Sequence, residues 1–131
     1  MKLILKKSDA PVSKKLDIYT RDVPCLDAAW HYHKEFELLY ISQSNGIRFV
    51  GDSVAPFFAG DLVLVGSYLP HLWRNDPSYY SDESTQQVKT IVTKFTDDFL
   101  GKDIFQMPDF YNIRKLIEDC KLGLSFGKEI S

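Results

Sequence analysis

Residues 28–41 read AAWHYHKEFELLYI, a stretch that holds two histidines one residue apart, two glutamates and an apolar run. Side chains two positions apart on a β-strand point to the same face, so His31 and His33 are expected to project together. Glu37 lies on the apolar side of the strand that follows and is expected to point inward. If these two strands pair, the carboxylate of Glu37 can approach both imidazoles.

A third histidine, His71, follows Glu37 by thirty-four residues, beyond a Gly60-Asp61 turn. Three imidazoles and a carboxylate are a suitable ligand set for Zn, Ni, Fe or Mn. Two alternatives stay open: the first two histidines can be hydrogen-bonded pocket residues, and His71 can simply close the turn after Pro70. We therefore expect no required cofactor, with a divalent metal at the His/Glu cluster as the other possibility.

Short strands separated by regular turns surround this stretch and predict an all-β antiparallel sandwich or barrel. Pro56 should place its strand at a sheet edge, and the polar residues 76–87 should form a mobile loop. The expected strands are 16–20, 36–42, 62–66 and 88–95, with a hairpin turn at 44–46 and further turns at 51–52 and 59–61.

The pattern changes after Phe95, because apolar residues recur at helical spacing over residues 109–121. Asp109 can cap this helix and Gly123 can end it. The apolar stripe predicts packing on the outside of the barrel, or a dimer interface. We expect a barrel with an N-terminal arm over 1–107, then over 108–131 the helix and the start of a linker to a further domain.

The motif HxHxxxE at His31, His33 and Glu37, followed by Gly60-Asp61 and His71, resembles the two motifs of the cupin superfamily. Within that superfamily, the stretches HYHKEFELLYISQSNGIRFVGD and FFAGDLVLVGSYLPHLWRND are similar to the N-terminal sensing domain of AraC-type transcription regulators. The likeness covers roughly residues 14–127. It implies a double-stranded β-helix, or jelly-roll, barrel with the C-terminal helix packed outside and an effector pocket within.

The candidate ligand-binding residues are His31, His33, Glu37, His71 and Trp73, and the first four are also the candidate metal ligands. Trp73 can line an effector pocket, although an aromatic residue at strand spacing is more often part of the core. A carboxylate turned inward at Glu37 needs a metal, a histidine or hydrogen-bond donors around it.

Composition narrows the classes of function. The formal net charge is −2 and no basic stripe is visible, which argues against direct nucleic-acid binding by this segment. Two distant cysteines and the lack of a long apolar run indicate a reduced, cytoplasmic protein with no membrane contact.

Three hypotheses follow from the sequence. The leading one is that the chain is not an enzyme but an effector-sensing domain of an AraC-family regulator. It would bind a sugar or other metabolite as a homodimer and would contact DNA only through an absent C-terminal domain. The alternative is a metal-dependent cupin enzyme, a dioxygenase or isomerase, with a 3-His/1-Glu site. The third is a binding or dimerisation module without an effector.

Overall fold

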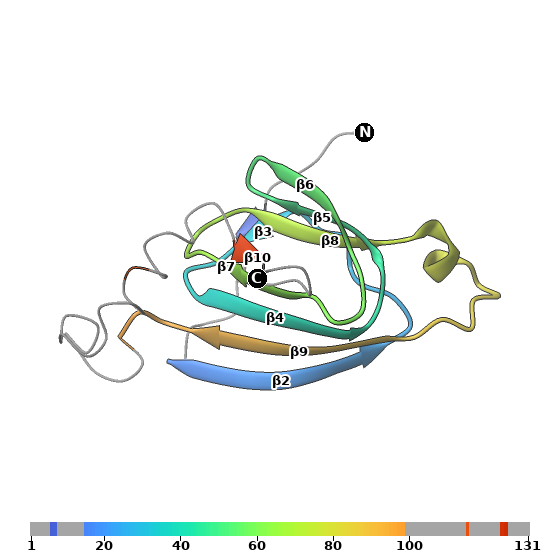
Figure 1. The fold of residues 1–131 in the computed structure, drawn as a ribbon, viewed down its shortest axis with the longest axis horizontal. Helices are drawn as coiled ribbons and strands as arrows, with labels where there is room; N and C mark the ends of the chain where they lie inside the picture. The colour runs from blue at the N-terminus through green and yellow to red at the C-terminus, as the bar shows by residue number, and fades with distance from the viewer. Residues whose placement is uncertain (1–5, 8–14, 99–114, 116–123, 126–131) are drawn as a thin grey trace.

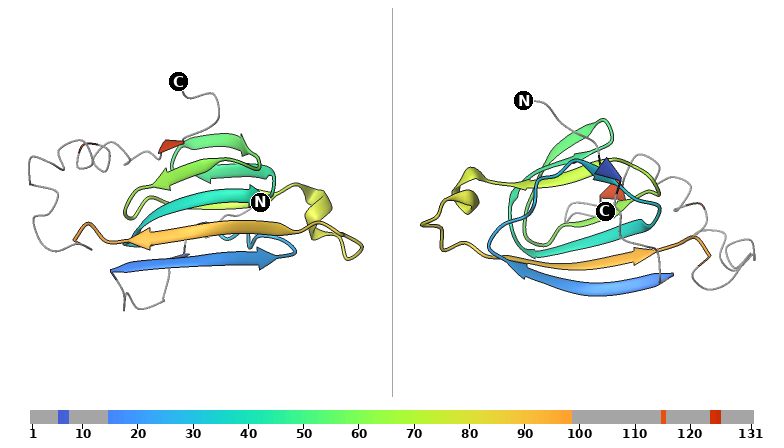
Figure 2. Two further views of the ribbon diagram at one scale, coloured as in Figure 1. Left: turned by 60° about the horizontal axis from the view of Figure 1, so that its bottom comes forward. Right: turned by 180° about the vertical axis from the view of Figure 1, so that it is seen from behind.

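The computed structural model describes residues 6–7, 15–98, 115 and 124–125. They form two five-stranded sheets, which face one another as layers (Figures 1 and 2). We call the sheet with strand order β1-β3-β8-β5-β6 sheet A, and the sheet with order β10-β7-β4-β9-β2 sheet B. The elements are β1 (Lys6–Lys7), β2 (Leu16–Val23), β3 (His31–Tyr32), β4 (Phe36–Gln43), β5 (Gly46–Val50), β6 (Ser53–Phe57), β7 (Leu62–Val65), β8 (His71–Asn75), the 3-10 helix η1 (Pro77–Tyr80), β9 (Val88–Phe95) and β10 (Leu124–Ser125).

The core lies between the sheets and is filled by the alternating inward side chains of their strands. In β9, Val88, Thr90 and Val92 are each at most 2% exposed, and the residues between them point outward. In β7 the three residues from Val63 to Val65 are all buried, so the apolar run predicted at 62–66 is confirmed as a strand buried on both faces.

The all-β fold class predicted from the sequence is confirmed by these two sheets. Pro56 lies in β6, the edge strand of sheet A, as expected for a residue without an amide hydrogen. The helix predicted at 109–121 and the linker after it lie outside the described residues, Lys115 excepted. Within the part of the chain that the structure describes, no helix has the length and apolar character needed to cross a membrane.

The turn at residues 44–46 does not form a hairpin, so that prediction was wrong. β4 pairs with β7 and β9 in sheet B, whereas β5 pairs with β6 and β8 in sheet A. The chain therefore crosses from one sheet to the other at Ser44 and Asn45. Gly46 makes this crossing possible, because a Cβ atom there would collide with the carbonyl oxygen of Arg74 on β8.

The polar stretch 76–87 is more ordered at its start than the sequence predicts. Asp76 accepts a hydrogen bond from the backbone amide of Ser78 at 3.1 Å and caps the short helix η1. Tyr79 in that helix is only 5% exposed and packs into the core. The loop is anchored at this point because an apolar ring can be buried there.

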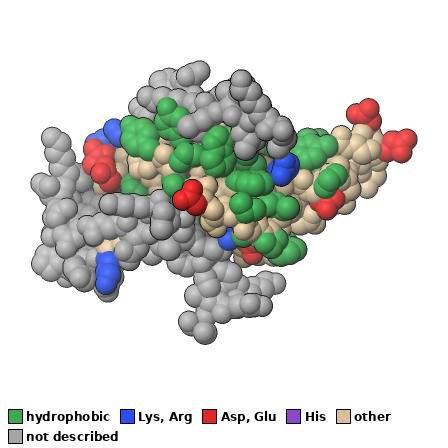
Figure 3. All heavy atoms as spheres, turned by 90° about the horizontal axis from the view of Figure 1, so that it is seen from above, with side chains coloured by type: hydrophobic (Ala, Val, Ile, Leu, Met, Phe, Trp, Pro, Cys, Tyr) green, Lys and Arg blue, Asp and Glu red, His purple; other side chains and the backbone are tan. Residues whose placement is uncertain are grey.

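Apolar side chains also lie on the outside of sheet A. Ile47 on β5, Val54 on β6 and Phe58 just after β6 are between 43 and 62% exposed. Hydrophobic side chains gather on the face where β5 and β6 lie (Figure 3). No histidine is visible on that face, in agreement with the burial of His33 and His71 in the barrel interior.

Candidate metal centre

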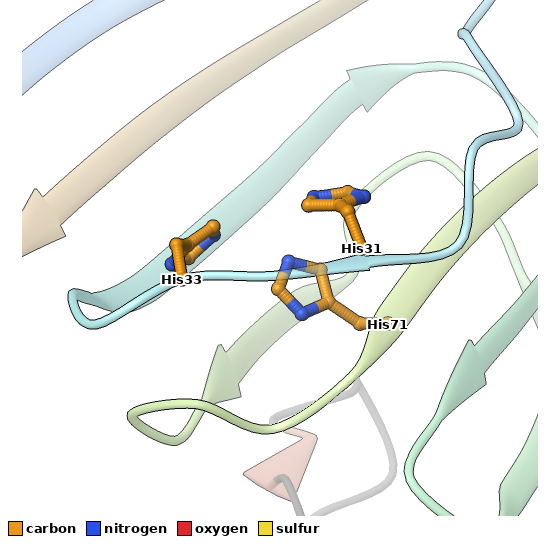
Figure 4. A group of neighbouring side chains, drawn as sticks. All are labelled: His31, His33 and His71. Atoms are coloured by element: carbon orange, nitrogen blue, oxygen red, sulfur yellow. The ribbon is translucent and has the colours of Figure 1, made fainter. Parts of the chain in front are cut away.

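Three imidazole rings meet inside the barrel (Figure 4). His31 on β3 and His71 at the start of β8 are partners in register, and His33 follows β3 directly. One ring nitrogen from each histidine lies within 4.8 Å of those of the other two. His71 and His33 are 1% and 4% exposed, whereas His31 is partly exposed. Solvent therefore reaches the cluster on the His31 side.

Backbone carbonyl groups fix the orientation of all three rings. The Nδ1 atoms of His31 and His71 lie 2.7 Å from the carbonyl oxygens of Ala29 and Leu69, each two residues earlier. The Nδ1 atom of His33 lies 3.0 Å from the carbonyl oxygen of Glu35. A carbonyl oxygen can only accept, so each Nδ1 carries the hydrogen and donates it. In the neutral ring this leaves the Nε2 lone pair free to bind a metal, the arrangement that metal-binding histidines commonly show.

Glu37 reaches the histidines from the opposite sheet. Its strand does not pair with the strand of His31, because β3 pairs with β1 and β8 while β4 lies in sheet B. The carboxylate nevertheless points inward and is buried. Its Oε1 atom lies 3.2 Å from Nε2 of His33 and 3.9 Å from Nε2 of His71.

The contact between Glu37 and His33 requires a positively charged species. His33 already donates its Nδ1 hydrogen, so its neutral form would present a lone pair to a carboxylate oxygen at 3.2 Å. Two lone pairs at that distance repel each other. Either a proton on Nε2 or a metal cation in its place makes the arrangement favourable.

The environment keeps Glu37 ionised and His71 neutral at pH 7. Burial is the largest influence on Glu37 and acts to raise its pKa. The hydrogen bond with His33 and the electrostatic interactions with His71, His33 and Lys94 outweigh burial and lower the pKa to about 2. For His71 burial dominates and lowers the pKa from 6.5 to about 4, against the opposing effect of the Glu37 carboxylate.

These residues fit a divalent transition metal. Nε2 of His71 is buried and has no hydrogen-bond partner among the described residues, a costly condition that a metal ion would relieve. Three neutral imidazoles and one carboxylate would bind such an ion through nitrogen and oxygen. The clustering of His31, His33 and His71 that the sequence predicts is therefore present, and these three side chains could bind a metal.

Trp73 lies beside the cluster but belongs to the core. It is 6% exposed, and its ring centroid is 5.7 Å from that of His71. Its indole N–H has no hydrogen-bond partner among the described residues. Its role in binding a ligand stays a prediction.

Asn75, which follows His71 in the second motif, stands apart from the metal cluster. Its side chain accepts a hydrogen bond from the backbone amide of Leu26 at 2.7 Å, and donates to Ser44 at 2.7 Å and to the carbonyl of Asn45 at 3.0 Å. Asn75 thus ties together three segments at the end of the barrel remote from His71.

Replacing Asn75 by alanine is expected to lower the free energy of unfolding by about 2 kcal/mol, because the Leu26 amide and the Asn45 carbonyl lose a buried partner. Metal affinity should be unchanged. Urea denaturation and metal titration of the same variant measure the two effects. A loss of metal affinity in a variant of normal stability would place Asn75 in the metal site instead.

Two features of the site were missed by the sequence reasoning. Lys94 lies on the inward face of β9, opposite Glu37 in register. The alternation Val88, Thr90, Val92, Lys94 in the predicted strand was a signal that could have found it. The three carbonyl acceptors left no trace in the side-chain pattern, because they belong to the backbone.

A separate surface depression of about 530 Å³ lies at the far end of β8. Its lining includes Ile47, Phe58, Arg74 and Tyr80. Arg74 is three residues from His71, about 10 Å along an extended strand. This depression is therefore distinct from the histidine cluster.

Comparison with known proteins supports the fold. No family model matches the chain, and no curated protein matches its sequence. Solved structures do match. A cupin 2 conserved barrel domain protein from Salinispora arenicola is 17% identical, with a TM-score of 0.51, over 80% of this chain and 76% of its own. The plu4264 protein from Photorhabdus luminescens is 16% identical, with a TM-score of 0.50, over 83% of this chain and 78% of its own. At these identities the likeness establishes a cupin-type barrel.

The expectation that the chain is not an enzyme was wrong. The matching structures include FeII HppE in complex with substrate, which is 21% identical with a TM-score of 0.49 over 62% of this chain. Another of them is CoII HppE. A barrel whose interior brings together three histidines that could hold a metal gives no ground for excluding an enzyme. The chain spans about half the length of HppE, since the match covers 46% of that chain.

Proposed function

We propose that the chain is a metal-dependent cupin enzyme, a dioxygenase or isomerase, that holds one divalent transition metal ion with His31, His33, His71 and Glu37. The observation that carries the proposal is that three rings with carbonyl-bound Nδ1 atoms converge with a buried carboxylate. Four protein ligands would leave room on such an ion for substrate or another small molecule.

Each part of the site has a defined task in this proposal. A bound ion would supply Lewis-acid activation of a coordinated oxygen atom. The chain's own contribution is rigid placement: the carbonyls of Ala29, Glu35 and Leu69 hold the rings, so that ligand binding requires little reorganisation. Glu37 supplies negative charge and can hold a proton with Nε2 of His33 when no ion is bound.

The test is metal binding by the wild-type chain. Metal-free protein is supplied with Fe²⁺, Mn²⁺, Co²⁺, Ni²⁺ or Zn²⁺ in turn, and bound metal is measured by mass spectrometry after gel filtration. One ion per chain is expected for at least one of these metals, together with a raised melting temperature, because the ion binds the folded state. Loss of all five metals during gel filtration would contradict the proposal.

A second candidate, the effector-sensing role, is favoured by one observation. The N-terminal strand β1 pairs in parallel with β3, with Lys6 opposite His31. A ligand bound at His31 would therefore act on a strand that is hydrogen-bonded to the N-terminal segment. In this role a small-molecule effector would bias a homodimer and an attached DNA-binding domain. Thermal-shift measurements with sugars and small acids, in the presence and absence of metal, test whether any such effector stabilises the chain.

A further inference from the structure

Strand β2 forms one edge of sheet B. It pairs with β9 over all eight of its residues, from Leu16 to Val23. Among the described residues, no strand pairs with its other side. Figures 1 and 2 show it as the outermost strand of its layer. A regular edge of this length presents amide and carbonyl groups without strand partners, so it is a template for pairing with another chain.

The backbone groups at this free edge belong to the even-numbered residues of β2. The amide of Thr96 donates a hydrogen bond to the carbonyl oxygen of Lys15 at 2.9 Å, so these two residues form a hydrogen-bonded pair. Such pairs alternate along an antiparallel ladder, and the odd-numbered residues of β2 therefore bond to β9. The residues whose amide and carbonyl groups face the free edge are Leu16, Ile18, Thr20 and Asp22.

The charged side chains of β2 are arranged so that they match a second copy of the same strand. Asp17 and Arg21 lie two residues before and two residues after Tyr19, and all three project to one face. If two copies pair antiparallel around a two-fold axis at Tyr19, each Asp17 lies opposite Arg21 of the other copy. Opposite charges in facing positions stabilise a pair of strands, and like charges destabilise it.

The charges around β2 leave this match in place. Asp17 has Lys94 as its register partner on β9, on the side away from the free edge. Arg21 has the uncharged Thr90 as its register partner, and its guanidinium group lies 5.9 Å from the centroid of the Tyr19 ring. A second copy would therefore add a charge partner to each of the two side chains from the open side.

The same charges select one register. Since only even-numbered residues offer backbone groups at the free edge, the two-fold axis can move only in steps of one residue along the strand. An axis at Ile18 would place Lys15 opposite Arg21, which are like charges. An axis at Thr20 would place Asp17 opposite the apolar Val23. The axis at Tyr19 is the one of these three that brings Asp17 and Arg21 together.

We propose that the chain forms a homodimer in which the two β2 strands pair antiparallel around a two-fold axis at Tyr19. This pairing joins the two copies of sheet B into one continuous sheet. Ile18, which is 61% exposed, then faces Thr20 of the other copy, and the two residues exchange backbone hydrogen bonds. A two-fold axis is the commonest symmetry of soluble oligomers. The inference goes beyond the proposed function and does not depend on a bound metal.

Charge reversal tests the match, and the two-fold axis makes each substitution act twice. Asp17→Arg places arginine opposite arginine, and Arg21→Asp places aspartate opposite aspartate. Each variant alone is expected to dimerise at least tenfold more weakly than wild type, as measured by sedimentation equilibrium. An equimolar mixture of the two should recover the wild-type affinity as a heterodimer, because every facing pair is then an aspartate and an arginine. Arg74→Asp, the same exchange on β8 of sheet A, should leave the dimer unchanged.

A backbone variant tests the edge itself. Thr20→Pro removes an amide hydrogen that faces the free edge and leaves the hydrogen bonds with β9 in place, a position where an edge strand accepts proline. It should weaken the dimer at least tenfold with an unchanged circular dichroism spectrum. This variant and Arg21→Asp keep the inference testable where Asp17→Arg, which adds a second cation beside Lys94, fails to fold.

Cross-linking tests the register. In a chain that carries Cys25→Ser and Cys120→Ser, Tyr19→Cys should form an intermolecular disulfide on mild oxidation. Facing Cα atoms in a non-hydrogen-bonded pair are about 4.5 Å apart, which lies within the range that a disulfide spans. Thr20→Cys is the matched control, because it faces Ile18 of the other copy and should cross-link far less.

Three results overturn the inference. The first is a wild-type chain that stays monomeric at every concentration in the sedimentation experiment. The second is a dimer that Thr20→Pro and Arg21→Asp leave unchanged, which must then use another surface. The third is a pair of folded charge-reversal variants whose mixture gives no heterodimer. Metal binding is measured separately, so each of these results leaves the proposed function standing.

Discussion

Alanine in place of His71 is expected to lower the affinity for a divalent transition metal at least a hundredfold. The substitution removes one of three imidazole ligands and the Nε2 atom that has no other partner among the described residues. Since outer partners of metal ligands alone affect affinity by about 10- to 100-fold, loss of a ligand itself should exceed that range. Competition titration with a chromophoric chelator measures the effect.

Trp73→Phe is a suitable control for this variant, because it alters a side chain that packs on His71 and leaves every proposed ligand in place. Its metal affinity should stay close to that of wild type. Circular dichroism of the metal-free His71→Ala protein shows whether the barrel is folded. A folded His71→Ala chain that binds metal as tightly as wild type would remove His71 from the site.

Acid is expected to destabilise the metal-free barrel well above the pH at which exposed carboxylates titrate. The pKa of His71 is about 4 in the folded chain and 6.5 when unperturbed. Below pH 6.5 His71 is therefore protonated in the unfolded chain but stays neutral in the folded chain. The free energy of unfolding falls as the pH drops toward 4. The difference between these two pKa values of His71 corresponds to a loss of about 3 kcal/mol in the free energy of unfolding. The pKa of Glu37, about 2 against 4.5, adds a further loss between pH 4.5 and 2.

Urea unfolding in the presence of a chelator at pH 7, 5.5 and 4.5 measures this dependence. His71→Leu is the matched variant, since leucine fills similar space and does not titrate. Its free energy of unfolding should vary less between pH 7 and 4.5 than that of wild type. If the free energy of unfolding depends on pH equally in the two chains, His71 is not the group that causes the acid destabilisation.

The sequence predicted the parts of this molecule that depend on which face of a strand a residue occupies. The alternation of β9, the buried strand β7 and the inward direction of Glu37 all follow from the two-residue period of extended chains. That period says nothing about which strands become neighbours. The failed hairpin at 44–46 is an error of pairing, and the strand of Glu37 lies in the sheet opposite the strand of His31.

The site likewise combines features that the sequence indicated and features that depend on the folded path of the chain. The spacing of His31, His33 and His71 indicated that the imidazoles could meet, and they do. The spacing did not indicate that carbonyl groups at Ala29, Glu35 and Leu69 would set their tautomers, because every residue has a carbonyl and only the folded path decides which one is near. Lys94 was visible in the pattern as a charged residue at an inward position.

The four proposed ligands come from both layers of the barrel: the histidines from β3, β8 and the residue after β3, and the carboxylate from β4. A single ion bound to all of them would fasten the two layers together at one end, as a disulfide fastens two segments of a secreted protein. Opening of the layers and dissociation of the ion would then be one event. The thermal resistance of the barrel would thus depend on how much metal the surroundings provide.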